Sequence, residues 1–166
     1  MSLKPRLKQQ LEFARSATER MLAVFKTPQD WTFQVHPAAN HALWVAGHLG
    51  TVDNFYLSAV APAEVQMPAG YREKFGMGSR PAGSPDAYPP VAEVLDFFRQ
   101  RRAALLRTLD GLSEQSLLTA APAGAPPFIR DVAGFFEAAV WHEGLHAGQI
   151  TIARRALGHP PMVGPV

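Results

Sequence analysis

The sequence predicts an all-α protein, an antiparallel four-helix bundle with a long Pro- and Gly-rich loop between the second and third helices. Four segments place apolar residues on one side with a period near 3.6, which is the period of an α-helix. No segment has the alternating pattern of a strand, and no internal repeat is present. Helices joined by both short and long loops are typical of a four-helix bundle. The 166 residues fit one domain, which we expect to span residues 1–166.

Local signals set the expected limits of the first two helices. The first helix is expected over residues 3–25, and Pro28 follows its end. The second is expected over residues 39–60, with Asn40 as its N-cap and Pro62 beyond its far end.

The connection over residues 61–90 contains ten Pro and Gly residues, a density that disfavours regular structure. A loop of about 30 residues is unusual in a compact domain and is often functional. We therefore expect it to border a pocket and to help select the substrate. The third helix is expected over residues 91–109, with Gly111 as a C′ glycine. The fourth is expected over residues 129–157 and should stop at Gly158.

Three histidines lie on the predicted apolar stripes of two helices. His142 and His146 are four residues apart, so their side chains project from one face about one turn apart. His48 is central in the stripe of the second helix. A buried imidazole without a partner is costly, and one metal ion that accepts all three removes this cost. The alternative is three ordinary core histidines bonded to the backbone or to one another. His41 shares the stripe of His48 but lies near the helix start, where we expect it in water.

Three histidine ligands leave coordination positions open, which is typical of a catalytic metal. Neutral imidazoles suit zinc, nickel, cobalt or iron, and the ligand type does not choose among them. The sequence therefore predicts one divalent metal ion held by His48, His142 and His146, of undetermined identity.

Two segments resemble the DinB superfamily. One is Ala42–Leu49, with the sequence ALWVAGHL, followed by Asp53. The other is Trp141–Ile150, with the sequence WHEGLHAGQI, followed by Arg154 and Arg155. The resemblance implies a four-helix bundle with a three-histidine metal site, and often a homodimer. Characterised relatives transfer a low-molecular-weight thiol such as bacillithiol, or use mycothiol to isomerise a substrate, and many members have no known reaction.

Three further residues are weaker candidates for a catalytic role. Glu143 completes an H-E-x-x-H match, as in metalloprotease helices, but it should point about 100° away from the histidine stripe. We expect it to support a ligand or to lie on the surface. Gln149 lies one turn past His146 and could bond a metal-bound water or an adjacent histidine. Arg102 interrupts an apolar stripe and should either reach water with its charged end or bind an anionic substrate group.

Two other side chains are expected to have structural roles. Asp53 faces away from His48, so we expect it to pair with an arginine or cap a loop. Trp141 is expected in the core, as large aromatic side chains usually are.

The composition narrows the classes of function. A net charge of +2 with scattered basic residues gives no reason to expect a nucleic-acid partner. No apolar run is long enough to span a membrane, no signal peptide is visible, and the chain has no cysteine. We therefore expect a cytoplasmic protein that acts on a small molecule. The predicted metal site favours a metal-dependent enzyme, and the resemblance to the DinB superfamily implies a reaction such as thiol S-transfer. The alternatives are a metal-dependent hydrolase, a non-catalytic bundle that binds a metal and a small ligand, and a degenerate structural member.

Overall fold

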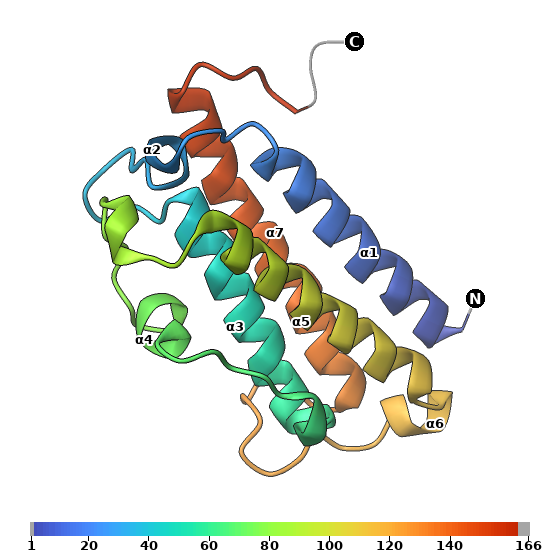
Figure 1. The fold of residues 1–166 in the computed structure, drawn as a ribbon. Helices are drawn as coiled ribbons and strands as arrows, with labels where there is room; N and C mark the ends of the chain where they lie inside the picture. Colours follow the sequence, from blue (N-terminus) through green and yellow to red (C-terminus); the bar gives the residue numbers. More distant parts are fainter. Residues whose placement is uncertain (1, 163–166) are drawn as a thin grey trace.

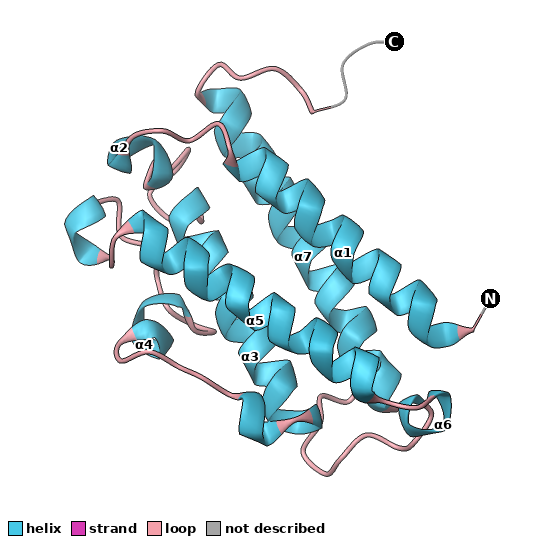
Figure 2. Cartoon of the chain, turned by 45° about the vertical axis from the view of Figure 1, so that its right-hand side comes forward, coloured by secondary structure: helices cyan, strands magenta, loops and turns pink. Residues whose placement is uncertain are grey.

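Four long helices form the framework of the computed structural model, which describes residues 2–162 (Figure 1). They are α1 (Leu3–Leu22), α3 (Ala42–Val60), α5 (Val91–Gly111) and α7 (Val132–Ala156). Helix α1 packs against α5 and α7, and α3 packs against the same two helices. The part of the chain described contains no strand (Figure 2). The predicted all-α bundle is confirmed.

The long connection determines the direction of the helices. Lys8 pairs with Asp110 and Glu19 pairs with Arg99, so α1 and α5 are antiparallel. Helix α7 likewise runs opposite to α3, whereas α3 and α5 run in the same direction (Figure 1). A chain can join two parallel helices only by returning along the bundle, and residues 61–90 make this return. Arg15 pairs with Glu143 and Thr151 contacts Met21, so α1 and α7 also run in the same direction. The bundle is therefore two parallel pairs, α1 with α7 and α3 with α5, that run opposite to each other, and the long crossover joins α3 to α5.

Regular structure appears in the crossover in three short pieces, contrary to the expectation that Pro and Gly would prevent it. They are η1 (Pro62–Glu64), α4 (Tyr71–Phe75) and η2 (Pro85–Ala87). Proline starts both 3₁₀ turns, where its missing N–H costs nothing. Two further short helices are α2 (Pro28–Trp31) and α6 (Glu114–Leu117).

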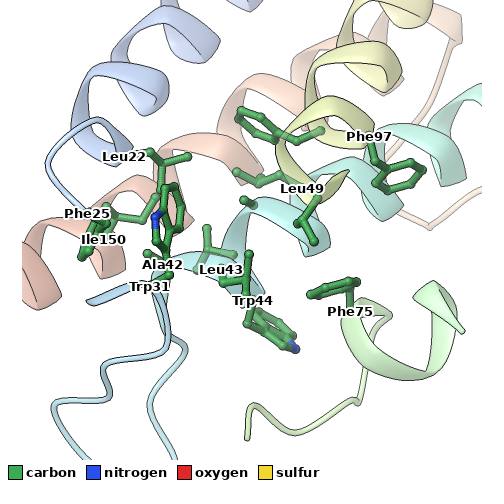
Figure 3. Close-up of a cluster of buried hydrophobic side chains, with 14 of the residues drawn as sticks. Leu22, Phe25, Trp31, Ala42, Leu43, Trp44, Leu49, Phe75, Phe97 and Ile150 are labelled. Carbon is green, nitrogen blue, oxygen red and sulfur yellow. The ribbon is translucent and has the colours of Figure 1, made fainter. Parts of the chain in front are cut away.

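The crossover packs tightly on α3 at one glycine. A Cβ atom built on Gly47 would lie 2.4 Å from Cδ1 of Phe75. Phe75 is fully buried, and its ring lies beside this end of α3, near Trp44 (Figure 3). Any larger residue at position 47 would push α4 away from α3.

Two helix-end predictions were wrong by one or a few residues. The N-cap of α3 is His41 rather than Asn40, and Nδ1 of His41 accepts a 3.1 Å hydrogen bond from the N–H of Trp44. Gly111 is the last residue of α5 and lacks the positive φ of a C′ glycine. Gly158 does have it, with φ of +85°, just beyond the end of α7.

His41 is fully buried, contrary to the expectation that it would lie in water. Its Nε2 donates to the carbonyl of Ala82 at 3.1 Å or to the hydroxyl of Tyr88 at 3.2 Å, while Nδ1 caps α3. Protonation would destroy the cap, and burial lowers the pKa of His41 to about 4.

This arrangement predicts acid sensitivity. The unfolded chain binds a proton at position 41 near pH 6.5, whereas the folded chain does not until about pH 4, so stability falls as the pH falls through this window. The expected contribution is about 3 kcal/mol. His41→Asn retains a good N-cap residue without the titration. Denaturant unfolding at pH 7 and pH 4 should show a smaller loss in the variant, and equal losses would contradict the assignment.

The core consists of two apolar clusters, one toward each end of the bundle. One contains residues such as Leu22, Trp44, Phe98 and Ile150 (Figure 3). The other contains residues such as Leu11, Leu57, Leu105 and Phe136. On each helix a buried charged residue lies between the members of the two clusters. These residues are Arg15 on α1, Asp53 on α3, Arg102 on α5 and Glu143 on α7.

No helix in the described part of the chain is both long and apolar enough to cross a bilayer.

Candidate metal centre

The structure brings His48, His142 and His146 together between α3 and α7. One nitrogen from each ring lies within 4.8 Å of the nitrogens offered by the other two. The ring centroids are 4.5 Å apart for His142 and His146, and 4.8–5.1 Å apart for the two pairs that include His48. His48 and His146 are buried and His142 is half-buried. Three imidazoles at these distances could hold one ion.

His48 is oriented by a backbone carbonyl of the crossover. Its Nδ1 donates to the carbonyl oxygen of Phe75 at 2.7 Å, which leaves Nε2 as the atom available to a metal. The indole of Trp44 stacks on the ring of His48, at 4.4 Å between centroids and 14° between planes. The same indole donates to Ser79 Oγ at 2.9 Å. The crossover therefore borders the histidine cluster through Phe75 and Ser79.

His146 is oriented by a pair of amide side chains. Its Nδ1 lies 2.9 Å from Oε1 of Gln149, and the same oxygen accepts a 3.0 Å hydrogen bond from Nδ2 of Asn40. Because the oxygen can only accept, Nδ1 of His146 carries the hydrogen and Nε2 is free to bind a metal. Gln149 thus bonds an adjacent histidine, as its position on the helix suggested. Asn40 was expected only to cap α3, so its role was missed.

The donor set fits a divalent metal. Nε2 of His142 lies 3.1 Å from Nε2 of His146, so both nitrogens point toward the same place. Without an ion, one of them must carry a proton to make this contact favourable. Burial lowers the pKa of His48 to about 4 and that of His142 to about 3, and it also lowers the pKa of His146. The three rings are therefore neutral at pH 7, which is the form that binds metal.

Glu143 and Arg102 lie in a buried ionic cluster rather than at the surface or at an open pocket. Glu143 is fully buried, with Oε1 at 2.8 Å from Nε of Arg15 and Oε2 at 2.6 Å from a terminal nitrogen of Arg102. Asp53 accepts two hydrogen bonds from Arg102, at 2.9 and 3.0 Å, and one from Arg15 at 3.0 Å. We call these four residues, one from each long helix, the ionic tetrad.

The tetrad corrects two predictions and clarifies a third. Arg102 neither reaches water nor faces an open pocket, because its side chain is 2% exposed and its three partners, Asp53, Glu143 and the carbonyl of Leu11, are all internal. Glu143 does not lie on the surface, and its carboxylate bonds arginines rather than a histidine. Asp53 pairs with arginines, one of the two roles expected for it.

The predicted stripe of α7 has the correct period but is rotated about the helix axis. The most buried positions include Phe136, Glu143 and Ile150, whereas His142 and Gln149 are half-buried. Successive residues are about 100° apart, so the histidines lie at the edge of the core face that is turned toward α3. The site is therefore more accessible than its predicted central position implied.

The family model of the DinB superfamily matches residues 10–150. This chain belongs to the DinB superfamily. The match includes all three histidines and the whole tetrad, and it confirms the resemblance inferred from the two short motifs.

A solved structure has the same fold as this DinB protein. It is described as the crystal structure of a conserved protein from Enterococcus faecalis, with a TM-score of 0.69 and 17% sequence identity. The match covers 93% of this chain and 96% of that chain. At this identity the similarity concerns the fold alone. A comparison with curated proteins found no match.

Proposed function

We propose that this DinB protein binds one divalent metal ion through His48, His142 and His146, and that it transfers a low-molecular-weight thiol to a small electrophile. The observation that carries the proposal is the convergence of three neutral imidazoles, two of which have their second nitrogen held by an oxygen acceptor. Such outer hydrogen bonds fix the ring orientation of metal-binding histidines. Zinc, nickel, cobalt and iron all suit this ligand set.

The proposed reaction class comes from the thiol chemistry that the DinB resemblance implies, and the site and the sequence are compatible with it. A bound divalent metal would lower the pKa of a thiol beside it, so that the thiolate forms at neutral pH. The chain has no cysteine, so the sulfur must come from a free thiol. With a haloalkane, the sulfur forms a bond to carbon, the halide leaves with the bonding electrons, and the thiol proton passes to solvent. A free thiol persists in a reducing compartment, which supports the cytoplasm as the site of the proposed reaction.

The surroundings of the histidines favour transfer over proteolysis. In a metalloprotease the glutamate of H-E-x-x-H acts as the base, and it needs access to water. Here Glu143 is fully buried and paired with Arg15 and Arg102. The side chains that contact the rings are Trp44 and Gln149, which orient the histidines without moving protons.

The experiment is a thiol-consumption assay with the metal-loaded protein. The panel should contain bacillithiol, mycothiol and simpler thiols, each with a haloalkane or an epoxide. We expect at least one pair to react faster than without protein. His48→Ala should abolish this gain, whereas His36→Ala, which removes an exposed histidine outside the cluster, should retain it. Uncatalysed rates across the panel would refute the transferase, and ester or amide turnover by the same protein would favour a hydrolase.

A further inference from the structure

The surfaces of α7 and α5 each carry a groove, and the groove on α5 is the larger of the two. The groove on α7 has a volume of about 400 Å³ and lies beside Trp141, which is 65% exposed although it was expected in the core. The groove on α5 has a volume of about 770 Å³, which is within the range of small-molecule sites. One wall is the outer face of α5, and the other is formed by residues 66–71 of the crossover, which runs from the end of α3 to α4 (Figure 1). It shares no lining residue with the metal centre.

Buried polar side chains hold the crossover wall of this groove in place. Asn54 of α3 is buried and bonds both the N–H and the carbonyl of Gln66, at 3.1 and 3.0 Å. Arg101 of α5 is also buried, and it donates to Oε1 of Gln66 at 2.9 Å and to the carbonyl of Glu64 at 2.7 Å. Arg101 lies behind Gln66 and does not line the groove. These bonds join the wall to α3 and α5, so the groove has its shape before a ligand binds, which lowers the cost of binding.

A buried tyrosine brings an unpartnered hydroxyl to the groove. Tyr71 is 5% exposed, and its ring packs edge-on against Phe97 at 4.9 Å between centroids. Both residues line the groove. Among residues 2–162 no hydrogen bond involves the hydroxyl of Tyr71, and the oxygen is not one of the polar atoms sealed in the core without a partner. Because polar groups on buried residues normally have partners, this hydroxyl is free to bond a ligand in the groove.

The charges that line the groove are negative. Glu93 and Asp96 are exposed and lie about one turn apart on the same side of α5. Burial and the negative charge of Glu93 raise the pKa of Tyr71, so this carboxylate lies close to the hydroxyl. Arg99 lies 4.0 Å from Asp96 but pairs more closely with Glu19, at 3.0 Å. No cationic side chain of the described residues lines the groove.

We propose that this groove binds a small organic cation, an ammonium group attached to an apolar or aromatic body. An ammonium group has three donors, which match the carboxylates of Glu93 and Asp96 and the oxygen of Tyr71. The apolar body would lie over Phe97 and against Met67, which also lines the groove. An anion would be repelled by the two carboxylates. This site is separate from the metal centre and does not depend on the proposed reaction.

Titration calorimetry with phenethylamine tests the charge requirement. We expect a dissociation constant below about 1 mM for the amine. Phenethyl alcohol has a similar shape without the charge and should bind about 10-fold more weakly, and the double variant Glu93→Gln, Asp96→Asn should weaken the amine to the same degree. Glu73→Gln, an exposed change on α4 outside the groove, is the matched control and should bind the amine as the wild type does. An amine that does not bind at about 10 mM, or that binds the double variant as well as the control, would overturn the proposal.

Tyr71→Phe separates a binding role from a structural one. Phenylalanine keeps the packing on Phe97 and removes only a hydroxyl that bonds nothing in the described part of the chain. The urea midpoint of unfolding should therefore stay unchanged, while the amine should bind about 5-fold more weakly. An unchanged affinity would overturn the role given to this hydroxyl.

Amide chemical shifts in isotope-labelled, zinc-loaded protein locate the bound amine. The amine should shift the resonances of residues 66–71 and 93–100 and leave those around His142 and His146 in place. His142→Ala should bind the amine as the wild type does, whereas an amine that ligates the metal would lose its site in this variant. Shifts confined to the histidine cluster would overturn the proposal.

Discussion

Glu143→Gln is expected to destabilise the protein by about 3 kcal/mol, since breaking a buried ion pair leaves uncompensated charge in the core. Glu143 is fully buried between Arg15 and Arg102, and glutamine keeps the shape but removes the negative charge. Asp53 would then face two arginines alone. For a chain of this length, 3 kcal/mol corresponds to a fall of about 6–12 °C in the melting temperature.

Thermal and urea unfolding of the variant and the wild type measure this effect. Glu12→Gln provides the control, because Glu12 is exposed on α1 and the same change there removes only a solvated charge. We expect the control to lie within about 0.5 kcal/mol of the wild type. A Glu143→Gln protein as stable as the control would mean that the tetrad contributes no net stability through this carboxylate.

The tetrad also explains why one part of the site could not be predicted from the sequence. The 3.6 period of α7 was readable, but the rotation of its core face was not. Histidine looks more compatible with a core than glutamate does, so the stripe was centred on His142 instead of Glu143. What buries Glu143 is its pairing with Arg15 and Arg102, which are 128 and 41 positions away in the sequence. The signal available in the sequence was an arginine on an apolar stripe. Arg102 was identified as unusual on this basis, but its partners were not identified.

Residue positions and helix ends were predicted correctly where a short sequence pattern determines them. The positions of His142 and His146 follow from helical spacing alone, and the stop at Gly158 follows from its positive φ. Helix α2 was missed although its capping box, formed by Thr27 and Asp30, could have been read from the sequence. The contacts that orient the metal centre could not be predicted, because the carbonyl of Phe75 has no side-chain signature. They depend on the path of the crossover across α3.

Loss of the metal should lower the melting temperature by about 10 °C. A ligand that binds only the folded state at about a thousand times its dissociation constant contributes about 4 kcal/mol. In this protein that corresponds to about 8–16 °C. The three ligand nitrogens come from α3 and α7, so the ion would join two helices that the unfolded chain does not hold together. The measurement compares scanning calorimetry of the metal-loaded protein with that of protein treated with a chelator, after elemental analysis has verified the metal content of both.

The histidine variants separate this site from adventitious binding. His142→Ala removes a half-buried ring and should reduce the metal content from about one ion per chain to near zero. The chelator should then leave its melting temperature unchanged, because no bound ion remains to be lost. His36→Ala should bind metal and respond to the chelator as the wild type does, since the side chain of His36 is exposed and accepts a hydrogen bond from the backbone N–H of Ala38. Equal metal content in His142→Ala and the wild type would exclude the three-histidine site. A wild type whose melting temperature does not change when its ion is removed would indicate binding at the surface instead of between α3 and α7.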